Sequence, residues 1–125
     1  MKSYTDIEQS RKLAERLPVE SADSHYVRKI RDFRGEHVES EWSYPKYGNP
    51  NSKHANYIVQ NFSSYEKLPC WSLAALLNVL PSSTLDSSDD HHYRLHCMER
   101  FTEWHDNPID ACYEMIMKLK EKALL

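Results

Sequence analysis

The fold is decided by the stretch Pro69-Cys70-Trp71-Ser72-Leu73-Ala74-Ala75-Leu76-Leu77-Asn78-Val79-Leu80-Pro81. Its apolar side chains cover almost the whole circumference of a helix running from about Trp71 to Leu80, with a proline near each end. The thin polar side consists of Ser72, Ala75 and Asn78. Because a helix that is apolar nearly all round is buried on more than one face, we expect this helix at the centre of the core.

Two further helices are expected, one near each end of the chain. The first begins at Thr5, with Glu8 at the capping-box spacing, and ends before Pro18. The last begins with Asn107 as N-cap and Pro108 in the first helical position. Its apolar stripe repeats every three or four residues and comprises Cys112, Met115, Ile116, Leu119 and Ala123.

Between these helices the hydrophobic period changes to two, which predicts strands. We expect a hairpin from residues 25–31 and 37–44 around a turn at Gly35, and a second hairpin from 92–97 and 101–105. A third strand is expected at 56–62, whereas 46–55 and 81–90 read as polar loops. The order α-ββ(β)-α-ββ-α predicts one α+β domain over residues 1–125, an antiparallel sheet of hairpins with three helices.

Composition excludes several classes of protein. Only two of the 125 residues are glycine, so the chain has neither a glycine-rich phosphate loop nor a dinucleotide-binding fingerprint. The longest apolar run, 73–77, is far shorter than the ~20 residues of a membrane span, and the N-terminus lacks the apolar region of a signal peptide. Three cysteines without a CxxC pair indicate reduced thiols, so we expect a cytoplasmic protein without a membrane partner.

The basic segment 28–34 offers a nucleic-acid interface. Arg28, Lys29, Arg31 and Arg34 accompany Tyr26 and Phe33, and an aromatic, basic strand can stack on and clamp a single strand. A formal net charge of -3 makes nucleic acid an unfavoured partner. The alternative interpretation is an edge strand whose charges discourage aggregation.

Histidine and cysteine raise the question of a metal site, through His91, His92, His96, Cys97, His105 and Cys112. On one strand, however, His92 and His96 lie roughly 13 Å apart. A two-residue hairpin loop places His92 opposite His105. Such a loop prefers Asn-Gly, and Met98-Glu99 does not provide it, so a four-residue loop is favoured. Either even loop puts Leu95, Cys97, Thr102 and Trp104 on one buried face. An odd loop instead places Trp104 across from Arg94, a cation–π pair.

Three other candidate sites are weighed against structural roles. Asp86, Asp89 and Asp90 beside His91 and His92 suggest a Mg²⁺ cluster, but a solvated loop explains them better. Cys70, near the start of the central helix, is a candidate nucleophile, but a buried thiol is favoured. Trp42, Tyr44 and Tyr47 either anchor a protein interface or cover the sheet edge.

Three blocks of sequence resemble a known group. They are Ile7-Glu8-Gln9-Ser10 with Lys12-Leu13-Ala14, Leu17-Pro18 and Glu20-Ser21-Ala22-Asp23; Pro69 to Leu77 with Val79-Leu80-Pro81; and Asn107-Pro108-Ile109-Asp110-Ala111-Cys112 with Leu124-Leu125. The chain is similar to small uncharacterised proteins of Bacteroides-type gut bacteria and their phages and mobile elements. The resemblance implies a cytoplasmic accessory protein of bacterial or phage origin and carries no site residue.

We therefore expect a non-enzymatic protein-interaction or regulatory module, with no catalytic, cofactor or metal residues, that binds a protein partner or itself. The first alternative is a metal-binding protein or metal-dependent hydrolase that uses His92, His96 and His105. The second is a nucleic-acid accessory protein that uses the basic segment 28–34.

Overall fold

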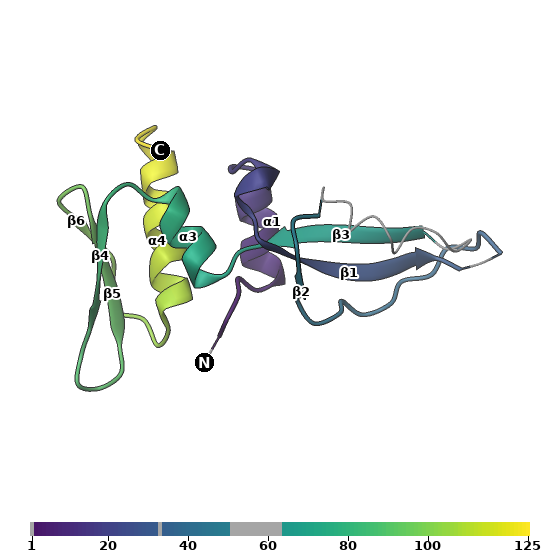
Figure 1. The fold of residues 1–125 in the computed structure, drawn as a ribbon, viewed down its shortest axis with the longest axis horizontal. Coiled ribbons are helices and arrows are strands. Elements are labelled where there is room, and N and C mark those ends of the chain that lie inside the picture. The colour runs from purple at the N-terminus through teal and green to yellow at the C-terminus, as the bar shows by residue number, and fades with distance from the viewer. Residues whose placement is uncertain (1, 33, 51–63) are drawn as a thin grey trace. The chain divides into compact units, whose positions relative to one another are not determined.

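The chain has an α+β fold, shown as a computed structural model that describes residues 2–32, 34–50 and 64–125 (Figure 1). Within these residues it contains three α-helices and two three-stranded antiparallel sheets. The expected class, helices and antiparallel strands are confirmed, with the strands divided between two sheets. The chain forms two compact units, Asp6–Trp71 and Ser72–Leu125 with the first residues to Thr5, called here the N-terminal and C-terminal units. A single domain over 1–125 stays a prediction.

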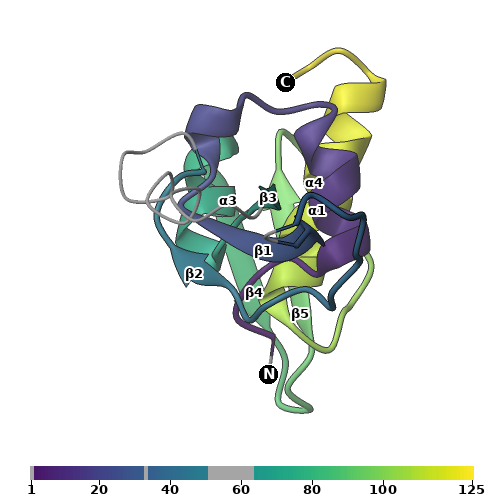
Figure 2. The same cartoon turned by 90° about the vertical axis from the view of Figure 1, so that its right-hand side faces the viewer.

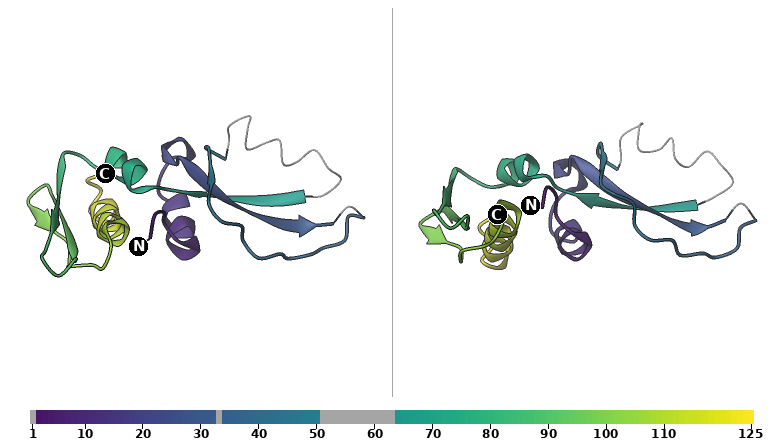
Figure 3. Two further views of the ribbon diagram at one scale, coloured as in Figure 1. Left: turned by 60° about the horizontal axis from the view of Figure 1, so that its bottom comes forward. Right: turned by 90° about the horizontal axis from the view of Figure 1, so that it is seen from below.

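The N-terminal unit packs one helix against a sheet of order β2-β1-β3. Its long strands β1 and β3 run antiparallel and side by side in both views of Figure 3. Helix α1 contacts β3, and the unit buries Leu13 of the helix and Val27 of the sheet. The elements are α1 (Ile7–Ala14), a 3-10 turn (Val19–Ser21), β1 (Ser24–Arg31), β2 (Lys46–Tyr47) and β3 (Ser64–Cys70).

The N-cap of α1 is Asp6, one residue later than the sequence predicts. The Asp6 carboxylate accepts the Gln9 amide hydrogen at 2.8 Å, and Gln9 Oε1 accepts the Asp6 amide hydrogen at 3.1 Å. Thr5 and Glu8 have the same spacing, but Thr5 is fully buried. The capping box is therefore present in the neighbouring register, where both side chains reach the backbone.

The segment 37–44 runs beside β1 but is not a regular strand, which corrects the predicted first hairpin. Backbone hydrogen bonds join it to β1 at three points, including Val38 N to Ile30 O at 2.9 Å. Between them, the hydroxyls of Ser43 and Ser40 accept the amide hydrogens of Val27 and Lys29. Serine side chains thus satisfy amides that a strand partner's carbonyls would satisfy.

Three other segments differ from the expected strand pattern. Residues 46–47 of the predicted loop 46–55 form β2, while 51–55 and the predicted strand 56–62 lie outside the described residues. The strand that pairs with the whole of β1 is β3, which the sequence reasoning missed. The predicted loop 81–90 contains β4, because Leu85 pairs with Leu95 and Asp86 with Arg94.

The C-terminal unit packs two helices with a sheet of order β4-β5-β6. Helix α4 lies along the sheet beside β5, and α3 contacts α4 (Figures 1 and 2). Buried side chains from α4 and β5 form its core, including Leu95, Met115, Ile116 and Leu119, each with no exposed surface. The elements are α3 (Leu73–Val79), β4 (Ser83–Ser87), β5 (Tyr93–Cys97), β6 (Arg100–Phe101) and α4 (Pro108–Glu121).

Helix α3 is shorter and less buried than the sequence predicts. It begins after Ser72, whose hydroxyl accepts the Ala75 amide hydrogen, so Trp71 stays outside the helix. Leu76 is fully buried and Leu77 only partly, while Ala75, expected on the polar side, is 6% exposed. The two-turn helix therefore buries one side and not its whole circumference.

Helix α4 confirms its predicted start and corrects its predicted end. Asn107 caps it, Pro108 follows, and the stripe from Cys112 to Leu119 is buried. Ala123 lies beyond the helix with φ +55, and the Leu124 amide donates to Leu119 O. This Schellman ending turns the chain away, so Ala123 is exposed. No helix in the described part of the chain is long and apolar enough to cross a bilayer.

Candidate functional site

The β5–β6 hairpin has a two-residue turn, which corrects the four-residue loop favoured from the sequence. Cys97 pairs with Arg100, so only Met98 and Glu99 lie between the strands. Both have positive φ, 52° and 62°, as a type I′ turn requires. Asn-Gly is the usual solution for such a turn, but two non-glycine residues adopt the same geometry here.

A one-residue bulge then changes the register along this hairpin. His96 pairs with Phe101, whereas Tyr93 pairs with His105, so four residue steps on the return segment match three on β5. The return segment therefore holds one extra residue between the two pairs. The pairing of His92 with His105, which a two-residue loop alone would give, is therefore absent, and Tyr93 takes that place. Trp104 instead lies across from Arg94, the register that an odd loop would have produced.

Four side chains of this hairpin form a stacked array that we call the arginine–aromatic ladder: Arg94, His96, Phe101 and Trp104. The guanidinium carbon of Arg94 lies 4.5 Å from the Phe101 ring centroid and 4.6 Å from the Trp104 ring. The His96 ring stacks on Phe101 with centroids 4.2 Å apart and planes 7° apart. The cation–π pair of Arg94 and Trp104 is thereby confirmed.

The ladder is open to solvent. Phe101 is 49% exposed and Trp104 45%, so the expectation that Trp104 shares the buried face is wrong. Asp86 on β4 lies 3.5 Å from the Arg94 guanidinium and balances its charge. We call the sheet face that carries the ladder the outer face.

Beneath the ladder, the opposite face of the hairpin is firmly packed. Leu95, Cys97 and Thr102 are buried, as the alternation predicts. The Thr102 hydroxyl accepts the Leu95 amide hydrogen at 2.9 Å, and the Thr102 amide donates to Leu95 O. The threonine side chain therefore replaces a backbone acceptor beside the bulge, and the ladder stands on a hydrogen-bonded base.

The three histidines of the metal hypothesis do not converge. His92 Nε2 lies 3.3 Å from Asp106, His96 stacks in the ladder, and His105 Nε2 donates to Glu114 at 2.8 Å. Within residues 2–32, 34–50 and 64–125, no three His, Cys, Asp or Glu side chains are arranged to hold a metal ion.

Glu114 on α4 ties the hairpin to the helix. Its carboxylate accepts hydrogen bonds from Lys118 at 2.7 Å, from His105 and from the Glu103 amide. Burial alone would raise the pKa of Glu114, but these hydrogen bonds outweigh it and lower the pKa below its ordinary value of 4.5. The carboxylate therefore has a structural role in positioning the segment between β6 and α4.

The three thiols are free and buried. Cys70 is the last residue of β3 and lies outside α3, so the helix dipole does not activate it. Burial and then the negative charge of Asp23 raise the pKa of Cys70 to about 12, and burial raises that of Cys112 to about 12. Cys70 is therefore the buried thiol that the sequence favoured, because a nucleophile requires an accessible thiolate.

The basic segment is divided between the two faces of a central strand. Arg28 and Lys29 are neighbours on β1 and point to opposite faces. Arg28 forms an ion pair with Glu66 at 2.7 Å and lies over the Trp42 ring. The interpretation as an edge strand is wrong, because β1 lies between β2 and β3. Phe33 lies outside the described residues.

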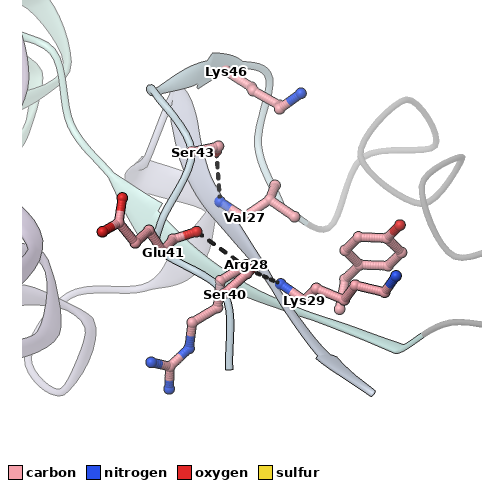
Figure 4. Close-up of a pocket in the computed structure, with 8 residues that line it drawn as sticks. Val27, Arg28, Lys29, Ser40, Glu41, Ser43 and Lys46 are labelled. Carbon is pink, nitrogen blue, oxygen red and sulfur yellow. Dashed lines mark hydrogen bonds between the residues drawn. The ribbon is translucent and has the colours of Figure 1, made fainter. Parts of the chain in front are cut away.

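A pocket of about 350 Å³ lies between β1 and the segment 40–46 (Figure 4). Ser40 and Ser43 line it, and their hydroxyls are engaged with the β1 backbone. Lys29, Glu41 and Lys46 also border it, which mixes both signs of charge. The pocket is open and its hydroxyls are already used, so it defines no ligand.

The aromatic group near the first hairpin separates into two roles. Trp42 contacts Arg28 and meets Tyr26 edge-on with ring centroids 6.5 Å apart, so it covers the sheet. Tyr44 and Tyr47 are 92% and 89% exposed. The covering role therefore holds for Trp42, whereas a role of Tyr44 and Tyr47 in a protein interface stays a prediction.

The acidic residues of the predicted Mg²⁺ cluster are also separated. Asp86 lies on β4 and is paired with Arg94, while Asp89 and Asp90 are exposed in the turn before β5. A solvated turn accounts for the latter two, as expected.

The sequence reasoning identified two members of the ladder as a pair, Arg94 and Trp104, but did not connect His96 or Phe101 with them. The available signal was the alternation of Arg94 and His96 opposite two aromatic residues. Comparisons with protein-family models, with curated proteins and with solved structures find no match to this chain, so the resemblance noted from the sequence stays a prediction.

Proposed function

We propose that this chain is a non-enzymatic protein-interaction module of the cytoplasm and that the outer face of the C-terminal sheet is its binding surface. The observation that carries the proposal is the exposure of Phe101 and Trp104 in a preformed ladder. Tryptophan and arginine are enriched among the residues that dominate binding energy at protein interfaces. Exposed aromatic surface also gains free energy when a partner removes it from water.

The rigidity of the ladder supports binding. His96 holds Phe101 by stacking, and Arg94 contacts both Phe101 and Trp104. Side chains that are already held in place lose little rotamer freedom when a partner docks, so more of the contact energy remains as affinity. The buried Leu95 and Thr102 fix the backbone below.

A non-catalytic role is supported by the arrangement of the reactive groups in the part of the chain that the structure describes. The thiols are buried with raised pKa values, and His92 and His105 are engaged with different carboxylates. Catalysis needs such groups to meet around one reacting atom.

The test is photo-crosslinking in the cell that makes the protein. A photoreactive amino acid replaces Thr84, which is exposed and pairs with His96 across the sheet. We expect a crosslinked protein that is identified by mass spectrometry, is lost in Trp104→Ala, and binds the purified chain with the same dependence on Trp104. The same crosslinker at Tyr47, which is also exposed and lies in the N-terminal unit, is the matched control.

Protein crosslinks that persist in Trp104→Ala, or none at all, would overturn this assignment of the binding surface. Circular dichroism of the variant confirms that its fold is retained.

A further inference from the structure

The charges around the arginine–aromatic ladder are mostly negative. Residues 86–106 contain six Asp and Glu side chains and two Arg. Asp89 and Asp90 are exposed in the turn before β5, and Glu99 is exposed in the turn after it. Exposed carboxylates therefore stand at both ends of the strand that carries Arg94 and His96.

The return segment adds to this rim. Glu103 is exposed, and the side chain of Asp106 is 92% exposed. Arg94, the cation at the centre of the face, is engaged within the protein, because it contacts two aromatic rings and Asp86. We call these five exposed carboxylates, Asp89, Asp90, Glu99, Glu103 and Asp106, the acidic rim.

The half-exposed rings favour the same sign of charge. The face of an aromatic ring carries partial negative charge and attracts cations, with tryptophan the strongest of the three aromatic side chains. Trp104 keeps 45% of its surface exposed beside Arg94. A lysine or arginine from a partner can therefore stack on Trp104 while its neighbours meet the acidic rim.

Other occupants are disfavoured by the same charges. Nucleic acid brings phosphates, which the rim repels. A second copy of this chain, docked face to face, brings an identical acidic rim and suffers like-charge repulsion.

We propose that the outer face binds a protein segment rich in lysine and arginine. This inference rests on the proposed function and deepens it by stating the chemistry of the partner. The cationic side chains of that segment stack on Trp104 and pair with the acidic rim, and the apolar parts of its side chains cover Phe101.

The experiment is a titration of the full ¹⁵N-labelled chain, followed by nuclear magnetic resonance, with a short peptide in which lysine alternates with leucine and serine. We expect shifts at the Trp104 indole and at the amides of β5 and β6. The same peptide with glutamate in place of lysine should give none. Raising the salt concentration from about 50 to about 300 mM should weaken binding, because the attraction is screened.

Matched variants separate the two contributions. Trp104→Ala should weaken binding at least about threefold through loss of the cation–π contact, whereas Tyr47→Ala should leave it unchanged. The paired change Glu103→Gln with Asp106→Asn should weaken binding without touching the ladder.

Several results would overturn the inference: equal or tighter binding of the glutamate peptide, binding of an oligothymidine but not of the lysine peptide, or a Trp104-dependent dimer in sedimentation. The crosslinking experiment distinguishes this failure from failure of the proposed function. If crosslinking through the Trp104 surface captured an acidic partner, the proposal of a lysine- and arginine-rich segment would be contradicted. The proposal that this surface binds a protein would still stand.

Discussion

The central strand of each sheet carries an arginine that stacks on a tryptophan, but the two pairs have different roles. Arg28 on β1 and Arg94 on β5 each place a guanidinium 4.6 Å from the centroid of a tryptophan ring. The pair of Arg28 and Trp42 is surrounded by other side chains: Glu66 lies 2.7 Å from the Arg28 guanidinium, and Trp42 also packs on Tyr26. Around Arg94 the ring of Trp104 stays half in water. A cation–π pair therefore does not itself indicate a binding surface; the neighbours of the tryptophan decide.

The two strands also share a way of satisfying their amides. Ser40 and Ser43 accept hydrogens from β1, and Thr102 accepts one from β5. In each case the adjacent chain departs from regular pairing and a hydroxyl takes the place of a carbonyl. The difference is again burial: Ser40 is exposed, whereas Thr102 is 5% exposed.

The largest expected effect compares the two tryptophans. Trp42→Ala should lower the free energy of unfolding by about 2 kcal/mol, roughly half the loss for a fully buried tryptophan, because its ring covers Tyr26 and Arg28. Trp104→Ala should cost less than about 1 kcal/mol, since its ring is half exposed. Urea denaturation measures both. Equal losses would contradict the division into a covering and a presenting tryptophan.

The second comparison concerns the hydroxyl acceptors. Thr102→Val should cost about 1–3 kcal/mol, because the buried Leu95 amide loses its acceptor while the side chain keeps its shape. Ser40→Ala should change stability by less than about 0.5 kcal/mol, because water can bind the Lys29 amide. Hydrogen exchange of the Leu95 and Lys29 amides provides a residue-level measurement. A larger loss of stability in Ser40→Ala than in Thr102→Val would reverse the expected order.

The third prediction concerns the acid sensitivity of the C-terminal unit. The folded-state pKa of Glu114 is lowered, so its contribution is present above the ordinary pKa of 4.5 and is lost as the pH falls through the folded value. Glu114→Gln should therefore cost about 1 kcal/mol near neutral pH and less as the pH falls below about 4.5. Thermal unfolding across this range tests it, with Glu99→Gln as the control in an exposed turn. A difference that grows on acidification has the wrong sign for this explanation.

The smallest effect compares the ends of α1 and α4. Ala123 closes α4 with φ +55, a conformation in which a Cβ atom is unfavourable. Ala123→Gly should raise the free energy of unfolding by about 0.5–1 kcal/mol. Glu15 closes α1 with φ -76, so Glu15→Gly should give no such gain. Stabilisation of both variants would point to a cause other than backbone conformation.

Local signals predicted the helices better than the strand partners. Asn107 and Pro108 gave the start of α4 because capping depends on a few adjacent residues. The cap of α1 was displaced by one residue, since two overlapping spacings met the same rule and burial of Thr5 decided between them. The pairing of β3 with β1 joins residues some forty positions apart, and no local pattern specifies such a pair.

The ladder was predictable only in part. The cation–π contact of Arg94 with Trp104 followed from counting registers, but the sequence assigned it to an odd loop. The structure reaches it with a two-residue turn and a bulge. A two-residue turn and a one-residue bulge together give the same register as a three-residue loop, and residue alternation sees only their sum. Burial of the opposite face, through Leu95 and Cys97, was correctly predicted because it depends on alternation alone.

The extra residue between Phe101 and His105 has a consequence for how this protein can change during evolution. Because the bulge absorbs one residue, deletion of Glu103 would leave Trp104 opposite Arg94 and His105 opposite Tyr93, now in a regular hairpin with the same two-residue turn. Substitutions at exposed positions of the same segment leave the pairing of the two strands unchanged. The pairing of Arg94 with Trp104 should therefore tolerate both substitution at these exposed positions and the loss of this one residue.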